Sequence, residues 1–217
     1  ADKGTTQAIK DAQQALDDAV KQAQSDLADV KNTAMSDMTK VPANLLDDKS
    51  VTDAKAALND AINSATATAT DVKNAQQALD DAVTAAKSAQ EGAAATANKA
   101  VTDVPASVKD SDAVKDAIAK VQGLTKDLTA DAATKSAIDQ AKQELAAAVA
   151  EQQGVRSDAV TAAKSALDAT APVSGEVAEQ IAALQKKLGD SSATASDIKQ
   201  AMNDLNDAVA TAKQERQ

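Results

Sequence analysis

The sequence predicts an all-α protein made of tandem three-helix bundles, and three observations support this prediction. About a quarter of the 217 residues are Ala, and Cys, His, Trp, Tyr and Phe are absent, which is typical of long helices. Glycine and proline are scarce and lie mostly between the periodic segments. A signature of six matched positions occurs four times. Its copies are Thr5, Ile9, Ala12, Leu16, Ala19, Val20; Thr68, Val72, Ala75, Leu79, Ala82, Val83; Thr134, Ile138, Ala141, Leu145, Ala148, Val149; and Thr194, Ile198, Ala201, Leu205, Ala208, Val209.

Each signature predicts the beginning of a helix. Its first four apolar residues follow one another at steps of three, four and three residues, which places them on one helical face. The Thr stands four residues ahead of the first of them, where its hydroxyl can accept a hydrogen bond from an unpaired backbone N–H as an N-cap. In the last copy, Asp197 follows Thr194 by three residues, which is close to a capping box.

Three long helices are expected, over residues 5–38, 70–102 and 134–169. Each is followed by a proline, which disfavours helix in the residue before it and cannot donate a hydrogen bond within one. These breaks are Val41-Pro42-Ala43, Val104-Pro105-Ala106 and Ala171-Pro172-Val173. Gly92 and Thr96 are expected to weaken the middle of the second long helix, by ~1 kcal/mol for the glycine. Gly154 lies near the midpoint of the third.

A shorter helix is expected after each proline, and the fourth signature then runs to the C-terminus. The first covers residues 50–65, and Gly189 ends the third. Their apolar faces are Val51, Ala54, Leu58, Ala61 and Ile62; Val114, Ala117, Ile118, Val121 and Leu124; and Ile181, Leu184 and Leu188.

The spacing of these landmarks predicts a repeat with one variable loop. The signature Leu precedes the next Pro by 26, 26 and 27 residues, and that Pro precedes Leu58, Val121 or Leu188 by 16 each time. The distance from those three residues to the next capping Thr is 10, 13 and 6 residues. Loops tolerate insertions better than packed helices do, so the variable segment is expected to be a loop between the second and third helices.

The helix lengths predict how the bundles connect. The long helices span roughly 45 Å and the short ones roughly 25 Å at 1.5 Å per residue. Each long helix is therefore expected to end one bundle and begin the next, in a spectrin-like rod roughly 100 Å long or more. The predicted bundles are residues 21–88, 89–152 and 153–217, and residues 1–20 are the trailing third helix of an upstream repeat. The stripe of Ile9, Leu16 and Val20 is expected to lack a partner, and so to fray or to pair between molecules.

The composition excludes several classes of function. A net charge of −10 and only two arginines, Arg156 and Arg216, argue against nucleic acid, whose phosphates require a basic patch. No apolar run is long enough to span a membrane. No signal peptide is visible and the chain begins Ala-Asp-Lys-Gly, so we expect it to be an excerpt of a longer protein.

No catalytic, cofactor-binding or metal-binding residue is predicted. Without His, Cys or Tyr, most pairs of nucleophile and base are excluded. The carboxylate pairs Asp17-Asp18, Asp80-Asp81 and Asp47-Asp48 are candidates for a recurring cation site. Adjacent helical residues do not face each other, however, so solvated outward positions are the favoured interpretation.

Two further sets of residues are interpreted as structural. Asp110-Ser111-Asp112 begins like a calcium loop but has Val114 at a ligand position and lacks the central Gly and final Glu. Met35, Met38 and Met202 lie on or near the apolar stripes and are expected to fill the core or the junctions.

Residues 50–83 and 177–209 resemble FIVAR modules, the "found in various architectures" helical repeats of Gram-positive cell-wall proteins. The matching features are a Leu-x-x-Ala-Ile type run in the middle helix, a Thr-capped third helix and a closing Leu-x-x-Ala-Val. The resemblance covers three units and most of the chain. It implies an extracellular surface protein, attached to the cell wall, whose repeats form a stalk or bind a host matrix protein or carbohydrate.

The leading functional expectation is a non-enzymatic, monomeric stalk that holds a distal adhesive domain of a bacterial adhesin away from the wall. The main alternative is that the repeats themselves bind a host matrix protein, such as fibronectin, or a wall polysaccharide. It ranks second because binding surfaces commonly use aromatic or Arg anchors, and the chain has no aromatic residue. An intracellular helical scaffold ranks third and an enzyme fourth.

Overall fold

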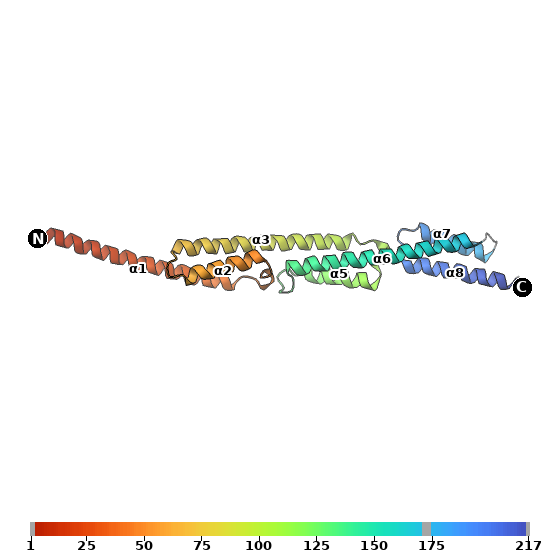
Figure 1. Ribbon diagram of the computed structural model, residues 1–217, viewed down its shortest axis with the longest axis horizontal. Coiled ribbons are helices and arrows are strands. Elements are labelled where there is room, and N and C mark those ends of the chain that lie inside the picture. The colour runs from red at the N-terminus through yellow and green to blue at the C-terminus, as the bar shows by residue number, and fades with distance from the viewer. Residues whose placement is uncertain (1–2, 171–174, 216–217) are drawn as a thin grey trace. The chain divides into compact units, whose positions relative to one another are not determined.

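The computed structural model describes residues 3–170 and 175–215, and Figure 1 shows the order of its helices. Within these ranges there are eight α-helices, one short 3₁₀ helix and no strand, so the predicted all-α class is confirmed. The elements are α1 (Lys3–Thr39), the 3₁₀ helix η1 (Ala43–Leu45), α2 (Lys49–Asn63), α3 (Ala69–Thr102), α4 (Ala106–Lys109), α5 (Asp112–Thr125), α6 (Lys135–Ala169), α7 (Glu176–Gly189) and α8 (Ala195–Gln214).

The three long helices lie where the apolar periodicity predicts them. Helices α1, α3 and α6 contain 37, 34 and 35 residues. Gly92 lies within α3 and Gly154 within α6, and neither ends its helix. A single glycine in a helix interior costs only about 1 kcal/mol, which the surrounding helix formers and the packed apolar faces outweigh.

Two of the three predicted proline breaks are present and have the same local structure. Pro42 and Pro105 both have extended backbone, with φ of −62° and −61°, and each begins a short helical turn, η1 or α4. The residues after each proline are buried: Asn44 and Leu45 in one case, Ser107 and Val108 in the other. The third break, at Ala171-Pro172-Val173, lies outside the described residues.

Capping threonines begin two of the helices as predicted. Thr194 Oγ1 accepts from the Asp197 N–H and the Asp197 carboxylate accepts from the Thr194 N–H, which forms a full capping box at α8. Thr68 and Asp71 make the same reciprocal pair at the beginning of α3. The prediction that Thr5 begins a helix is wrong, because α1 already includes Lys3, and Thr5 lies inside the helix.

The chain divides into two compact units. The first is Ala1–Gly92 with Leu128–Lys135, and the second is Ala93–Asp127 with Ser136–Gln217. The core of the first unit combines the second half of α1 with η1, α2 and the first half of α3, and in Figure 1 α2 runs beside α3. Its buried residues are Ala34, Leu45, Val51, Leu58, Ile62, Val72, Leu79 and Ala86.

The second unit contains a core formed by the second half of α6 with α7 and α8. Its buried residues are Ala159, Ala163, Val177, Leu184, Ala193, Ile198, Ala201, Leu205 and Ala208. The first half of α6 is also buried, through Ile138, Ala141 and Leu145, as are Val114 and Val121 of α5. Every large buried side chain here is aliphatic, as a chain without aromatic residues requires. The bundle limits at residues 20, 88 and 152 stay predictions.

The signature marks the buried face of three helices. Its Ile or Val and its Leu are buried in the second, third and fourth copies: Val72, Leu79, Ile138, Leu145, Ile198 and Leu205 are all 0 or 1% exposed. In the first copy, Ile9, Leu16 and Val20 are exposed, as expected for a stripe without a partner.

Candidate functional site

The carboxylate pairs are solvent-facing. Asp17, Asp18, Asp80 and Asp81 are all exposed on α1 and α3. Two of them accept from a glutamine one turn earlier on the same helix, Gln14 to Asp18 and Gln77 to Asp81, both at 2.8 Å. No group of three potential metal ligands lies within the described ranges. In each pair, one carboxylate therefore accepts a hydrogen bond from its own helix, and both carboxylates face solvent.

Of the other candidates, Asp48 caps a helix with its side chain, and Asp110 and Asp112 flank a serine cap. Asp48 precedes α2 and its side chain accepts from the Ser50 N–H at 2.8 Å. Ser111 is the N-cap of α5 and accepts from the Val114 N–H, so Asp110-Ser111-Asp112 leads directly into a helix. Hydrogen bonds from Ser50 lower the pKa of Asp48. Asp48 and Ser111 thus each satisfy a backbone donor at a helix end, which is the structural role expected of Asp and Ser at such positions.

The methionines divide between core and surface. Met38 packs against the core of the first unit and Met202 against that of α6 to α8, as predicted. The prediction for Met35 is wrong, since its side chain is 43% exposed on α1. Met35 follows the buried Ala34 by one residue, and a step of one turns the side chain about 100° away from the core face.

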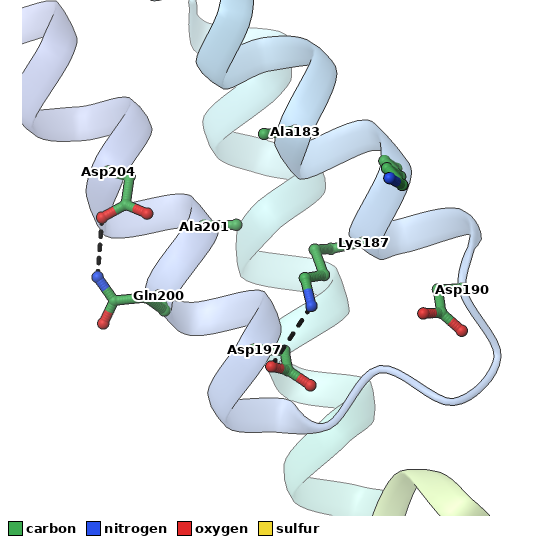
Figure 2. A pocket seen from close by; sticks show the side chains of 8 residues that line it. Ala183, Lys187, Asp190, Asp197, Gln200, Ala201 and Asp204 are labelled. Carbon is green, nitrogen blue, oxygen red and sulfur yellow. Dashed lines mark hydrogen bonds and ion pairs between the residues drawn. The ribbon is translucent and has the colours of Figure 1, made fainter.

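A cleft on the surface of α7 and α8 is lined by five charged side chains. It has a volume of about 610 Å³ and is lined by Ala183, Lys186, Lys187, Asp190, Asp197, Gln200, Ala201 and Asp204. Figure 2 shows Lys187 on α7 reaching toward Asp197 at the beginning of α8, with Gln200 and Asp204 on the next turns.

One ion pair and several hydrogen bonds hold the polar side chains of this cleft. Lys187 Nζ lies 3.5 Å from Asp197 Oδ1, and Gln200 donates to Asp204 at 2.8 Å. Hydrogen bonds from Thr194 lower the pKa of Asp197, and those from Ser192 lower the pKa of Asp190. A carboxylic acid that donates a proton at neutral pH needs a raised pKa, so these two groups are suited to accept hydrogen bonds at the α8 cap and in the loop before it, and not to act as general acids.

A second hollow, more apolar, lies between the end of α3 and the first half of α6. Its volume is about 530 Å³ and its lining includes Val104, Pro105, Leu145, Ala146 and Val149, with Lys142 at its edge. Lys99 and Asp103, which also line it, form an ion pair at 2.7 Å. It presents aliphatic surface beside the Lys99–Asp103 ion pair.

Several polar side chains that the sequence pattern does not predict donate hydrogen bonds to backbone carbonyls of loops that are distant in the sequence. Gln90 is 3% exposed and donates to the carbonyl oxygens of Leu128 and Ala133. Asn44, equally buried, donates to the same Leu128 carbonyl at 2.7 Å, while its Oδ1 has no hydrogen-bond partner among the described residues.

The same kind of bond recurs along the chain. Arg156 donates to the carbonyls of Ala193 and Asp190, and Lys31 donates to that of Ser64 at 3.1 Å. A signal for these residues exists in the sequence, since Gln90 stands between Ala86 and Ala93 at helical spacing, where an apolar residue is expected. The sequence does not predict which loop carbonyl accepts the hydrogen bond, because the acceptors of Gln90 lie 38 and 43 residues away.

Comparison with known proteins returns no match among protein-family models, curated proteins or solved structures. Within the part of the chain that the structure describes, no helix is both long enough and apolar enough to cross a lipid bilayer.

Proposed function

We propose that the chain is the non-enzymatic repeat region of a bacterial cell-surface adhesin, which projects a distal adhesive domain from the cell wall. In this proposal, tandem three-helix bundles of residues 21–88, 89–152 and 153–217 are joined through the long helices into a monomeric rod. The FIVAR-type resemblance of residues 50–83 and 177–209 provides the cellular context of the proposal.

One observation carries the architectural part of the proposal: the long helices have apolar residues in both halves. In α6, Ile138 and Leu145 are buried near the beginning, and Ala159 and Ala163 belong to the core with α7 and α8. In α3, Leu79 belongs to the core with α2, and Ala97, five turns further on, is also buried. A helix used twice in this way is suited to connect consecutive bundles without a flexible linker.

The surface chemistry supports a spacer role over an enzymatic one. The clefts present ion pairs and aliphatic surface, and the pKa of Asp197, the charged cap of α8, is lowered. An acidic surface with a net charge of −10 favours solubility and discourages association between copies.

Small-angle scattering with a mass determination tests the rod. A compact globule of this length has a radius of gyration of about 17 Å, whereas a thin rod of about 100 Å has one of about 29 Å. We expect the larger value at a monomeric mass, and the smaller value would refute the stalk. Antibody labelling of intact cells tests the location, and labelling only after lysis would contradict a surface protein.

A second candidate function is that the repeats bind a host matrix protein or a wall polymer themselves. The hollow between α3 and α6 favours it, because Pro105, Ala146 and Val149 present aliphatic surface that a protein ligand can cover. Solid-phase binding of the chain to fibronectin and to purified wall polysaccharide tests this alternative. Saturable binding that Val149→Asp abolishes would place it ahead of the stalk.

A further inference from the structure

The first signature copy exposes an apolar stripe that the second copy buries. Ile9, Leu16 and Val20 of α1 are 58, 65 and 46% exposed, whereas Val72 and Leu79, at the matching positions of α3, are 0 and 1% exposed. Eleven of the sixteen residues from 5 to 20 recur at positions 68–83, and residues 10–20 differ from 73–83 at a single position. Two nearly identical helical surfaces thus exist, one covered and one open.

The structure shows what covers the second copy. Val72 and Leu79 pack in one core with Val51, Leu58 and Ile62 of α2 and with Ala34 of α1. At the edge of this interface Gln76 of α3 donates to the Asp37 carboxylate of α1. The cover is therefore a two-helix hairpin with an aliphatic stripe and one carboxylate placed to accept from a glutamine.

The first copy keeps the residues that recognise such a hairpin. Ala12, Leu16 and Val20 match Ala75, Leu79 and Val83, and Gln13 matches Gln76. Gln13 is exposed on α1. The open stripe is also continuous with an established interface, because Leu27, Val30 and Ala34 follow it on α1 and pack into the core of the first unit.

The direction of the chain indicates where the cover comes from. In the core that contains Leu79, the covering helices α1 and α2 precede α3 in the sequence. In the core that contains Leu205, α6 and α7 likewise precede α8. The hairpins that pack against Leu79 and Leu205 are already covered by a third helix, α3 or α8. In a second folded copy of the chain, these hairpins are therefore not free to cover residues 5–20.

We infer that residues 5–20 are a docking surface for the two-helix hairpin of a further repeat of this kind, placed ahead of Thr5 in the same polypeptide. The partner presents an aliphatic stripe like Val51, Leu58 and Ile62 and a carboxylate like Asp37 opposite Gln13. The inference rests on the matched surfaces, and it holds or fails independently of the proposed stalk function.

The test supplies the missing hairpin in its natural order. A copy of residues 21–67 is fused directly ahead of Thr5 of the chain, just as residues 21–67 precede Thr68 in the protein. We expect amide hydrogen exchange of residues 9–20, followed by NMR, to slow by more than about tenfold, toward that of residues 72–83. In the matched control, Leu58→Asp is placed in the added copy only, and exchange at residues 9–20 is expected to return to its rate in the parent chain.

Three results would overturn the inference. The first is unchanged exchange at residues 9–20 in the fusion, and the second is an added hairpin that stays unfolded by circular dichroism, since its docking surface would then not have stabilised it. The third is a concentration-dependent dimer of the parent chain, seen by sedimentation and lost with Leu16→Asp, because the stripe would then serve a second copy.

Discussion

Gln90 and Arg156 hold the same position in successive repeats and make the same bond. Each lies 11 residues after a signature leucine, Leu79 or Leu145. Each donates to the carbonyl oxygen of the alanine that precedes the next capping threonine, Gln90 to Ala133 and Arg156 to Ala193. The loop of variable length is thus held by a hydrogen bond at the same residue in both repeats, the alanine before the capping threonine.

Removing this bond is expected to destabilise the second unit. Arg156 Nε donates to Ala193 at 2.8 Å and Nη2 donates to Asp190 at 3.2 Å, so Arg156→Ala leaves two carbonyls without their donors. We expect a loss of about 1–2 kcal/mol in the free energy of unfolding, measured with urea. Arg156→Gln is the matched control, because glutamine fills this position in the preceding repeat, and it is expected to lose less than Arg156→Ala. Equal losses would show that the packing of the arginine stem, not the hydrogen bond, is what matters.

Leu16 and Leu79 offer a test of burial at two equivalent positions. Leu79→Ala leaves a cavity in the core of the first unit and is expected to cost about 2–5 kcal/mol of unfolding free energy. Leu16 is 65% exposed, so Leu16→Ala is expected to change stability by no more than about 0.5 kcal/mol. Thermal and urea unfolding of the two variants measure both values. A comparable loss from both substitutions would contradict the open stripe.

Much of the fold can be predicted from the spacing of apolar residues and from the positions of prolines and capping residues. The step of three or four residues between apolar positions predicts α3 and α6 over nearly their full lengths, because no proline lies within either helix and Gly92 and Gly154 are isolated glycines. Pro42 and Pro105 predict the breaks, since proline restricts both its own backbone and that of its neighbour. The Thr194 capping box is also predictable, because the bond joins residues only three apart.

The polar contacts across the bundles could not be predicted in the same way. Asn44 and Gln90 meet at the Leu128 carbonyl, 84 and 38 residues away in the sequence, and no local pattern encodes that meeting. Thr5 shows the opposite error, since the residues of a cap are present but the helix already extends beyond them. A capping residue acts only where the chain leaves the helix, and tertiary context decides that.

The two threonines at matching positions are expected to respond with opposite signs to the same substitution. Thr194→Ala removes the Oγ1 that accepts from the Asp197 N–H and is expected to cost about 1 kcal/mol. Thr5 is an exposed residue inside α1, where alanine has the higher helix propensity, so Thr5→Ala is expected to stabilise by up to about 0.6 kcal/mol. Urea unfolding of each single variant against the parent measures these differences. A loss of unfolding free energy with Thr5→Ala would mean that Thr5 acts as a helix cap after all.

Acid is expected to weaken the helix beginnings. Hydrogen bonds from Thr68, Thr194 and Ser50 lower the pKa values of Asp71, Asp197 and Asp48 in the folded protein. In the unfolded chain these groups titrate near their ordinary value of about 3.9. Their contribution is therefore fully present above that pH and is lost as the pH falls through the lower folded values, because the unfolded state then binds more protons.

Urea unfolding as a function of pH measures this effect. We expect the midpoint to be level near neutral pH and to decline below about pH 4. Asp197→Asn is the matched control, since it keeps the shape of the side chain and removes the titration, and its midpoint is expected to decline less steeply. An identical decline in the variant would mean that other carboxylates govern the acid response.

Gly154 and Gly175 are expected to respond oppositely to alanine because of their backbone conformations. Gly154 lies in the middle of α6 with negative φ, and a Cβ added there would meet no atom within 4 Å. Gly154→Ala is therefore expected to stabilise the protein by up to about 1 kcal/mol, by restricting the unfolded chain and favouring the helix. Gly175 has φ of 81° and ψ of −145° just before α7, a conformation that L side chains rarely adopt, so Gly175→Ala is expected to cost about 1–3 kcal/mol. Thermal unfolding of the two variants decides the signs, and destabilisation by Gly154→Ala would mean that α6 needs the glycine for a bend.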